Sequence, residues 1–196
     1  MSTSQSGQEA PSEPPVVVIT GGTGGIGLQS AVGIARSGAR VVVVGRNAER
    51  GQAARAHIAE RTGNEAVELV VGDVSSSSGV DALATELLAR FPRIDVLVNN
   101  AGYLGDQPST NADGLEMHFA VNVFAPRRLT LALLPALTSA GKARVVNVTG
   151  GNKAGRIDPD NLQAEKGFKG LGTYSHSKSA MEAMSMALAD ELRPAE

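Results

Sequence analysis

Short apolar runs rich in β-branched residues recur along the chain, and each run ends in a polar or glycine-rich break. Strands that are apolar at nearly every position are typical of a parallel sheet that is covered on both faces. We therefore predict five buried strands, at residues 16–20, 39–45, 66–72, 94–98 and 143–149.

The segments between these runs have apolar residues at helical spacing. They predict helices at residues 28–36, 48–61, 80–90 and 174–192, and a long helical stretch at 114–139. Pro126 and Pro135 interrupt the long stretch, because proline disrupts a helix interior. Strands that alternate with helices predict a doubly wound α/β fold with an all-parallel sheet and right-handed crossovers.

Length and charge narrow the class of protein. The chain has 196 residues, of which 42% are hydrophobic, so we expect one domain with a full core at residues 15–196. Residues 1–14 are rich in Ser, Gln, Glu and Pro, and we predict a disordered tail there. The net charge of −2 gives no reason to expect nucleic acid or an anionic membrane as a partner.

Several kinds of site and location are disfavoured by what the sequence lacks. Without cysteine there are no disulfides or thiolate nucleophiles, and the three histidines are too scattered to predict a metal site. No apolar run approaches the roughly 20 residues that span a bilayer. The N-terminus has no basic or apolar region of a secretory signal. We therefore expect a soluble, cytoplasmic protein.

A glycine-rich turn follows the first predicted strand and contains five glycines within residues 21–27. A strand, a glycine turn and a helix N-terminus form an anion site, because backbone N–H groups are free there and glycine lets a pyrophosphate approach closely. This placement predicts dinucleotide binding. The subtype stays open, since G-x-G-x-x-G fits Gly22, Gly24 and Gly27. Thr20-Gly21-x-x-Gly24-x-x-Gly27 and Thr20-Gly21-x-x-x-Gly25-x-Gly27 both fit as well.

The end of the second predicted strand bears on the choice of cofactor. NAD sites usually place an Asp or Glu there, whereas this chain has Arg46 and Asn47. A guanidinium pairs with a 2′-phosphate, so Arg46 favours NADP, with NAD as the second choice. The alternative is an exposed arginine at the entry to the next helix.

Three further motifs follow in order: Asn99-Asn100-Ala101-Gly102 after the fourth strand, Asn122 in the long helix, and Tyr174-x-x-x-Lys178 in the last helix. With Thr20-Gly21-x-x-x-Gly25-x-Gly27 they resemble the classical branch of the short-chain dehydrogenase/reductase family over essentially all of residues 16–193. The Asn-Asn-Ala-Gly motif disfavours the extended branch, which modifies nucleotide sugars. Residues 155–166 are similar to the retinol-dehydrogenase-like subgroup.

The Tyr174–Lys178 pair also makes chemical sense by itself. Residues at i and i+4 share one helix face, and a nearby ammonium stabilises a phenolate, so the phenolic proton is easier to donate. The resemblance implies that Tyr174 is the acid/base and that Lys178 modulates it and binds the nicotinamide ribose. It implies that Asn122 holds a water that connects Lys178 to solvent. The alternative for Asn122 is a polar residue at a helix irregularity.

The resemblance further implies a Rossmann fold with strand order 3-2-1-4-5, hydride transfer between NADP(H) and a small carbonyl or alcohol, and a homodimer through the long helix and the last helix. The cofactor-binding residues that it implies are Thr20, Gly21, Thr23, Gly25, Ile26, Gly27, Arg46, Asn47, Asp73, Val74, Asn100, Ala101, Gly102, Tyr174 and Lys178. Asp73 could instead cap its own loop.

The chain departs from the family pattern at two places. Gly150 stands where the family places a serine that polarises the substrate carbonyl, and Thr149 is one residue early. Thr149 is therefore a provisional carbonyl partner, and a buried strand residue is the alternative. The sequence also stops at Glu196, so we expect the family's later strands to be missing and the fifth strand to lie at the sheet edge. These departures leave a rival hypothesis of a catalytically impaired nucleotide-binding or dimerising protein.

Overall fold

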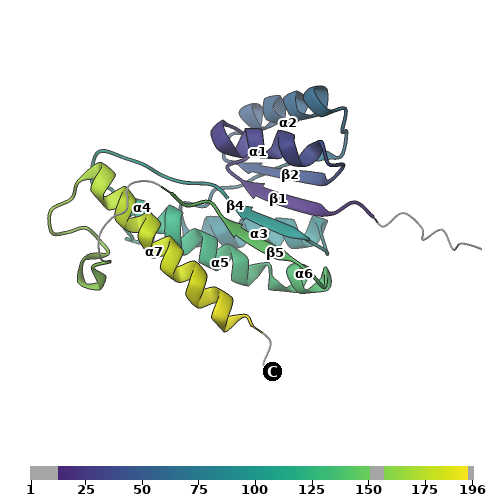
Figure 1. The fold of residues 1–196 in the computed structure, drawn as a ribbon. Coiled ribbons are helices and arrows are strands. Elements are labelled where there is room, and N and C mark those ends of the chain that lie inside the picture. Colours follow the sequence, from purple (N-terminus) through teal and green to yellow (C-terminus); the bar gives the residue numbers. More distant parts are fainter. Residues whose placement is uncertain (1–12, 151–156, 194–196) are drawn as a thin grey trace, which may run out of the picture.

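One parallel sheet of five strands forms the centre of the molecule, in the order β3-β2-β1-β4-β5 (Figure 1). The computed structural model describes residues 13–150 and 157–193. The strands are β1 (Val16–Thr20), β2 (Arg40–Gly45), β3 (Val67–Val71), β4 (Val96–Asn99) and β5 (Arg144–Asn147). The predicted fold class and strand order are confirmed.

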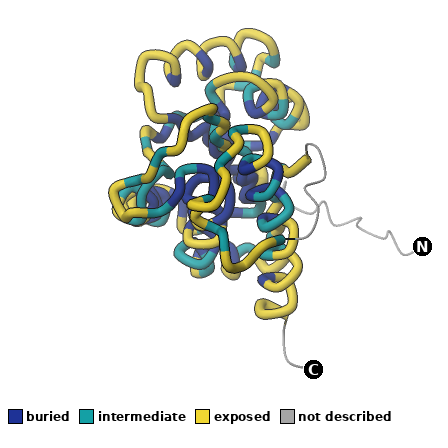
Figure 2. Tube along the Cα trace, turned by 90° about the vertical axis from the view of Figure 1, so that its left-hand side faces the viewer, coloured by how far each residue is buried: buried dark blue, intermediate teal, exposed yellow. Residues whose placement is uncertain are grey.

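Helices cover both faces of the sheet. Successive side chains of a strand point to opposite faces, so β1 contributes Val17 and Ile19 to one core and Val16 and Val18 to the other. The first core packs against α1 (Gly25–Ala35) and α2 (Ala48–Thr62). The second packs against α3 (Ser77–Arg90), α5 (Ala125–Ala132) and α6 (Leu134–Ser139). The buried stretches lie in the interior of the molecule and the exposed ones on its outside, as Figure 2 shows.

The remaining elements lie near the end of β4 and along α5. They are the short helix α4 (Met117–Phe119), the π-helical segment η1 (Ala120–Phe124), the 3₁₀ turn η2 (Pro159–Asn161) and the long helix α7 (Gly170–Glu191). Phe119 and Val123 pack against Met181 of α7 in a third, smaller apolar cluster. This cluster fixes α7 against the segment that carries Asn122.

Four helix starts differ from the sequence prediction, and one of them is α3, which begins at Ser77 instead of residue 80. The first helix begins at Gly25 instead of residue 28, and the last begins at Gly170 instead of Tyr174. Glycine is a poor helix former, so a sequence pattern does not reveal a first turn that contains it. The long helical stretch begins at Met117 and is broken as expected, with Pro126 and Pro135 in the first turns of α5 and α6, where a missing N–H costs no hydrogen bond.

Strand β5 lies at an edge of the described sheet and pairs there with β4 alone. Its central residues Val145 and Val146 are 37% and 44% exposed. The predicted tail at residues 1–14 lies outside the described residues except for Glu13 and Pro14, which are exposed. Among the described helices, none combines the length and the apolar character that a membrane crossing requires. The described residues also contain no cluster of three or more potential metal ligands.

Candidate functional site

A cavity of about 810 Å³ opens at the carboxyl ends of the strands. Parallel register aligns these ends, since Thr20 pairs with Val44 on one side and Asn99 on the other. Doubly wound sheets bind ligands at this edge. The cavity brings together most of the residues predicted from the sequence, namely Thr20, Gly21, Thr23, Ile26, Gly27, Arg46, Asp73, Val74, Asn100, Ala101, Gly102, Thr149, Tyr174 and Lys178. Gly25, Asn47 and Asn122 are not among its lining residues.

The glycine turn presents free backbone donors to this cavity. Helix α1 begins at Gly25, and its N-cap residue is Gly24, which has no side chain to cap the first N–H groups. Gly21 and Gly25 have positive φ angles of 66° and 52°, which side chains rarely adopt. A Cβ on Gly24 or Gly25 would meet nothing within 4 Å, whereas one on Gly27 would lie 2.4 Å from the carbonyl oxygen of Gly21. The turn is therefore closed on the protein side and open on the cavity side.

Thr20 and Asn100 join this turn to the loop after β4. The buried Thr20 hydroxyl accepts hydrogen bonds from the backbone N–H groups of Asn100 and Ala101, both at 3.1 Å. The Asn100 amide donates to the carbonyl oxygens of Thr20 at 2.9 Å and Gly21 at 3.2 Å. Both polar side chains thus hold the backbone of the cavity in place.

Two arginines lie where the cavity passes the end of β2. Arg46 was predicted from the sequence, and Arg50 lies one helical turn later in α2. Both are exposed, and neither makes an ion pair with a carboxylate within the described part of the chain. Asn47 instead caps α2, because its Oδ1 accepts from the Arg50 backbone N–H at 2.8 Å. The sequence signal for Arg50 was its i+4 spacing from Arg46.

Asp73 lies at the end of β3 and both lines the cavity and caps its own loop. Its carboxylate accepts from the Ser75 backbone N–H and from the Ser75 hydroxyl, each at 2.9 Å. The loop-capping interpretation is therefore observed, and contact of Asp73 with a cofactor adenine stays a prediction.

Tyr174 and Lys178 lie one turn apart on α7 and share the face that meets the cavity. The Lys178 Nζ is 5.7 Å from the centre of the Tyr174 ring. Lys178 is only 7% exposed, and its Nζ donates to the Val148 carbonyl oxygen at 3.0 Å. Burial lowers the pKa of Lys178 from its ordinary value, because the charged form loses solvation.

Asn122 is buried in η1 and connects α7 to the loop after β4. Its Oδ1 accepts from the Tyr103 N–H at 2.8 Å, and its Nδ2 donates to the Tyr103 carbonyl at 3.0 Å and to the Ser177 hydroxyl at 2.9 Å. A Cβ on Gly102 would lie 3.5 Å from Asn122 Oδ1 and 3.8 Å from Lys178 Nζ. The absent side chain at Gly102 therefore leaves space between the amide and the ammonium.

Thr149 lines the cavity, but its hydroxyl is directed at α7. It lies 3.1 Å from a Glu182 carboxylate oxygen and 3.5 Å from the Lys178 carbonyl oxygen. Gly150 has a φ of 117°, which a serine at this position would rarely adopt. Glycine at position 150, in place of the serine of the family pattern, therefore matches the backbone conformation found there.

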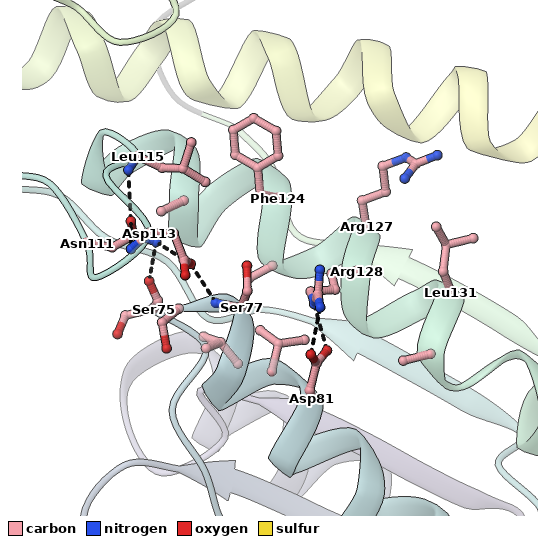
Figure 3. Close-up of a pocket in the computed structure, with 16 residues that line it drawn as sticks. Ser75, Ser77, Asp81, Asn111, Asp113, Leu115, Phe124, Arg127, Arg128 and Leu131 are labelled. Atoms are coloured by element: carbon pink, nitrogen blue, oxygen red, sulfur yellow. Dashed lines mark hydrogen bonds and ion pairs between the residues drawn. The ribbon is translucent and has the colours of Figure 1, made fainter.

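A second cavity, of about 450 Å³, lies between α3 and α5 (Figure 3). Arg128 and Asp81 form a two-fold hydrogen-bonded ion pair across it, with both distances 2.6 Å. The Asp113 carboxylate accepts from the Ser77 N–H at 2.7 Å, which ties the loop before α4 to the start of α3. This cavity contains Val74 but none of the predicted catalytic residues.

Comparisons with known proteins agree with this geometry. The chain matches the short chain dehydrogenase family over residues 15–196. It is 38% identical to human retinol dehydrogenase 11 over 179 residues, which are 91% of this chain and 56% of that protein. The chain therefore spans little more than half the length of this curated relative.

Two solved structures are similar as well. One is a metagenomic short-chain oxidoreductase in complex with NADP, with a TM-score of 0.74 and 30% identity over 91% of this chain and 76% of that one. The other is the NADP active-site complex of RhlG from Pseudomonas aeruginosa, with a TM-score of 0.73 and 31% identity over 91% and 67% of the two chains. The protein belongs to the short chain dehydrogenase family and resembles its retinol dehydrogenases.

Proposed function

We propose that the protein is an NADP-dependent oxidoreductase that transfers a hydride between NADP(H) and a small carbonyl or alcohol. One observation carries the proposal: a single cavity joins the free first turn of α1, the guanidinium groups of Arg46 and Arg50, and the Tyr174–Lys178 pair. Two similar structures are NADP complexes, which supports the choice of cofactor.

The residues present fit a dinucleotide phosphate. The open side of Gly24 and Gly25 leaves room for a pyrophosphate at the N-terminus of α1. Arg46 and Arg50 supply positive charge for a 2′-phosphate. Val74 and Asp73 lie at the adjacent end of β3, where the family resemblance places the adenine. NADP is therefore preferred over NAD.

The chain's own residues provide proton transfer in the reductive direction. Bound NADPH supplies the hydride. Tyr174 donates its phenolic proton to the substrate oxygen, and the Lys178 ammonium stabilises the phenolate that remains. The water-holding role of Asn122 stays a prediction, and because its amide is bonded to Tyr103 and Ser177, such a water would use the remaining lone pair of Oδ1 or the backbone.

We propose an apolar substrate. Leu104, Met117 and Val121 line the same cavity as Tyr174, which supports an apolar carbonyl compound over a charged one. The likeness to a retinol dehydrogenase supports an apolar alcohol or aldehyde.

The experiment has two steps. NADPH binding is first followed by cofactor fluorescence, and NADPH consumption is then measured with a panel of apolar aldehydes and ketones. We expect Tyr174→Phe to keep NADPH affinity and to lower kcat by about 10²–10⁴-fold. Turnover that survives in Tyr174→Phe would overturn the mechanism.

A catalytically impaired nucleotide-binding protein is the second candidate, and the site around Gly150 favours it. The family serine is absent there, and the Thr149 hydroxyl is directed at Glu182. Binding of NADPH without consumption of it, across the whole panel, would favour this candidate.

Assembly and location complete the proposal. We propose a homodimer through α5 and α7, because the exposed apolar residues Phe124 and Met186 lie at these helices. Light scattering of Met186→Glu, which is expected to be monomeric, tests this interface.

We also propose that the protein acts in the cytoplasm, and cell fractionation tests that location.

A further inference from the structure

A buried Glu–His pair at α4 lies close to Tyr174 of α7. Glu116 and His118 are 3% and 0% exposed, and the Glu116 Oε1 is 2.7 Å from the His118 Nδ1. The other imidazole nitrogen, Nε2, accepts from the Gly105 backbone N–H at 3.1 Å. A ring nitrogen that accepts carries no proton, so the proton is on Nδ1 and is donated to Glu116. His118 is therefore a neutral ring with both nitrogens in use.

The bond to Gly105 holds a short segment of the cavity wall. Tyr103 and Leu104 immediately precede Gly105 and line the cavity next to Tyr174. Asn122 already fixes the backbone of Tyr103 through both its N–H and its carbonyl. The bond from His118 adds a second attachment two residues later, beyond the 56% exposed Leu104.

The opposite side of the segment rests on the start of α7. A Cβ on Gly170 would lie 2.8 Å from the Gly105 carbonyl oxygen and 3.0 Å from the Asp106 Cα. The His118 ring also lies 6.4 Å from the Tyr174 ring and 5.9 Å from the Phe168 ring, measured between centres. The backbone at Gly105 and Asp106 is thus contacted both by His118 and by Gly170 in the first turn of α7, four residues before Tyr174.

We propose that His118 is a positioning residue that sets the substrate-facing wall at residues 103–106 through its Nε2 acceptor. This inference rests on the proposed function, because it concerns how the carbonyl substrate is held beside Tyr174. Gly105 is half-buried, so its N–H can turn to water when the acceptor is removed. Removing the acceptor while a donor for the buried Glu116 carboxylate is kept should therefore loosen the wall without leaving that carboxylate unpaired.

The test compares three variants at one position. His118→Leu removes both hydrogen bonds, His118→Asn can keep a donor for Glu116, and His118→Gln can keep an acceptor for Gly105. Hydrogen–deuterium exchange at residues 103–106 reports on the wall without any turnover. The KM for an aldehyde, kcat and the NADPH dissociation constant report on the site. His57→Asn, at an exposed position on α2, is the matched control.

We expect the Leu and Asn variants to exchange about tenfold faster at residues 103–106 and to raise the KM for the aldehyde by about tenfold. NADPH affinity should stay within about twofold, and His118→Gln should restore both values. Equal behaviour of Gln and Leu, or faster exchange across all helices, would overturn the proposal. If the wild type binds NADPH and reduces nothing, the proposed function fails, and the exchange measurement alone decides the role of His118.

Gly170→Ala provides a test that leaves His118 intact. The added methyl group presses on the segment at Gly105 from the opposite side. We expect the same rise in exchange at residues 103–106 and in KM. Faster exchange with an unchanged KM would show that the segment does not set the substrate wall.

Discussion

The Lys178 ammonium donates a 3.0 Å hydrogen bond to the Val148 carbonyl, just beyond the end of β5. This bond ties the face of α7 that carries Tyr174 and Lys178 to the sheet edge next to Thr149. No carboxylate forms an ion pair with Lys178 within the described part of the chain. Lys178 is therefore a buried charge that is held by a neutral backbone group.

Replacing Lys178 should change how stability depends on pH. Burial lowers the pKa of Lys178 below 10.5, so between the lowered value and 10.5 the unfolded chain binds more protons than the folded one. The contribution of Lys178 to the free energy of unfolding therefore rises with pH over that window. We expect the wild type to gain stability relative to Lys178→Met as the pH is raised towards 10.5, as measured by urea unfolding. A difference that is constant with pH would contradict this expectation.

Arg46 and Arg50 should discriminate between the two nicotinamide cofactors. Each would make charge-assisted bonds to a 2′-phosphate, so Arg46→Ala and Arg50→Ala should each weaken NADPH binding by about tenfold to a hundredfold. Arg46→Asp should weaken it further. NADH affinity should not fall, and calorimetric titration of both cofactors checks this. Arg36→Ala, on the exposed end of α1, is the matched control, and equal losses for NADPH and NADH would contradict the assignment.

Thr149→Val tests whether the threonine replaces the absent serine. The change keeps the shape and removes the hydroxyl, so a direct contact with the substrate oxygen predicts a kcat lower by about 10²–10³-fold. Thr149→Ser retains a hydroxyl and should keep most of the rate. Stopped-flow kinetics with NADPH measure both variants, and an unchanged rate in Thr149→Val would remove Thr149 from the mechanism.

Glu68 on β3 should contribute stability that is lost in acid. Burial acts to raise the pKa of Glu68, but hydrogen bonds and charges from Arg40 and Arg90 outweigh it and hold the pKa below 4.5. Stability from a lowered carboxyl pKa is complete above the unfolded value and disappears as the pH falls through the folded value. Glu68→Gln should cost about 1 kcal/mol or less at neutral pH, because both arginine partners are partly exposed to solvent.

The check on Glu68 is chemical unfolding of wild type and Glu68→Gln at several pH values. Their difference should shrink as the pH falls below 4.5. Glu86→Gln is a suitable control, because Glu86 is a more exposed partner of the same Arg90. A difference that grows in acid would contradict the predicted sign.

The sheet and its cavity could be predicted because continuous apolar strands and glycine turns leave a strong local pattern. Parallel strands bring their carboxyl ends together whatever the loops do, so Thr20, Arg46 and Asn100 at the ends of β1, β2 and β4 had to converge. Hydrogen bonds between distant segments leave no such pattern. Nothing local indicates that Asn122 holds Tyr103, that His118 holds Gly105, or that the Thr149 hydroxyl faces Glu182. The start of α7 was missed because Gly170 packs against another loop and thereby overrides its poor helix propensity.

The hydrogen bonds between Thr20 and Asn100 fix the conformation of the backbone that would contact a dinucleotide. The backbone N–H groups of Asn100 and Ala101 and the carbonyls of Thr20 and Gly21 are already hydrogen-bonded within the protein. The turn can therefore adopt few other conformations. Little conformational entropy then remains to be lost when the pyrophosphate docks, and more of the contact energy appears as affinity. Association should therefore resemble rigid docking of a nucleotide onto a preorganised surface.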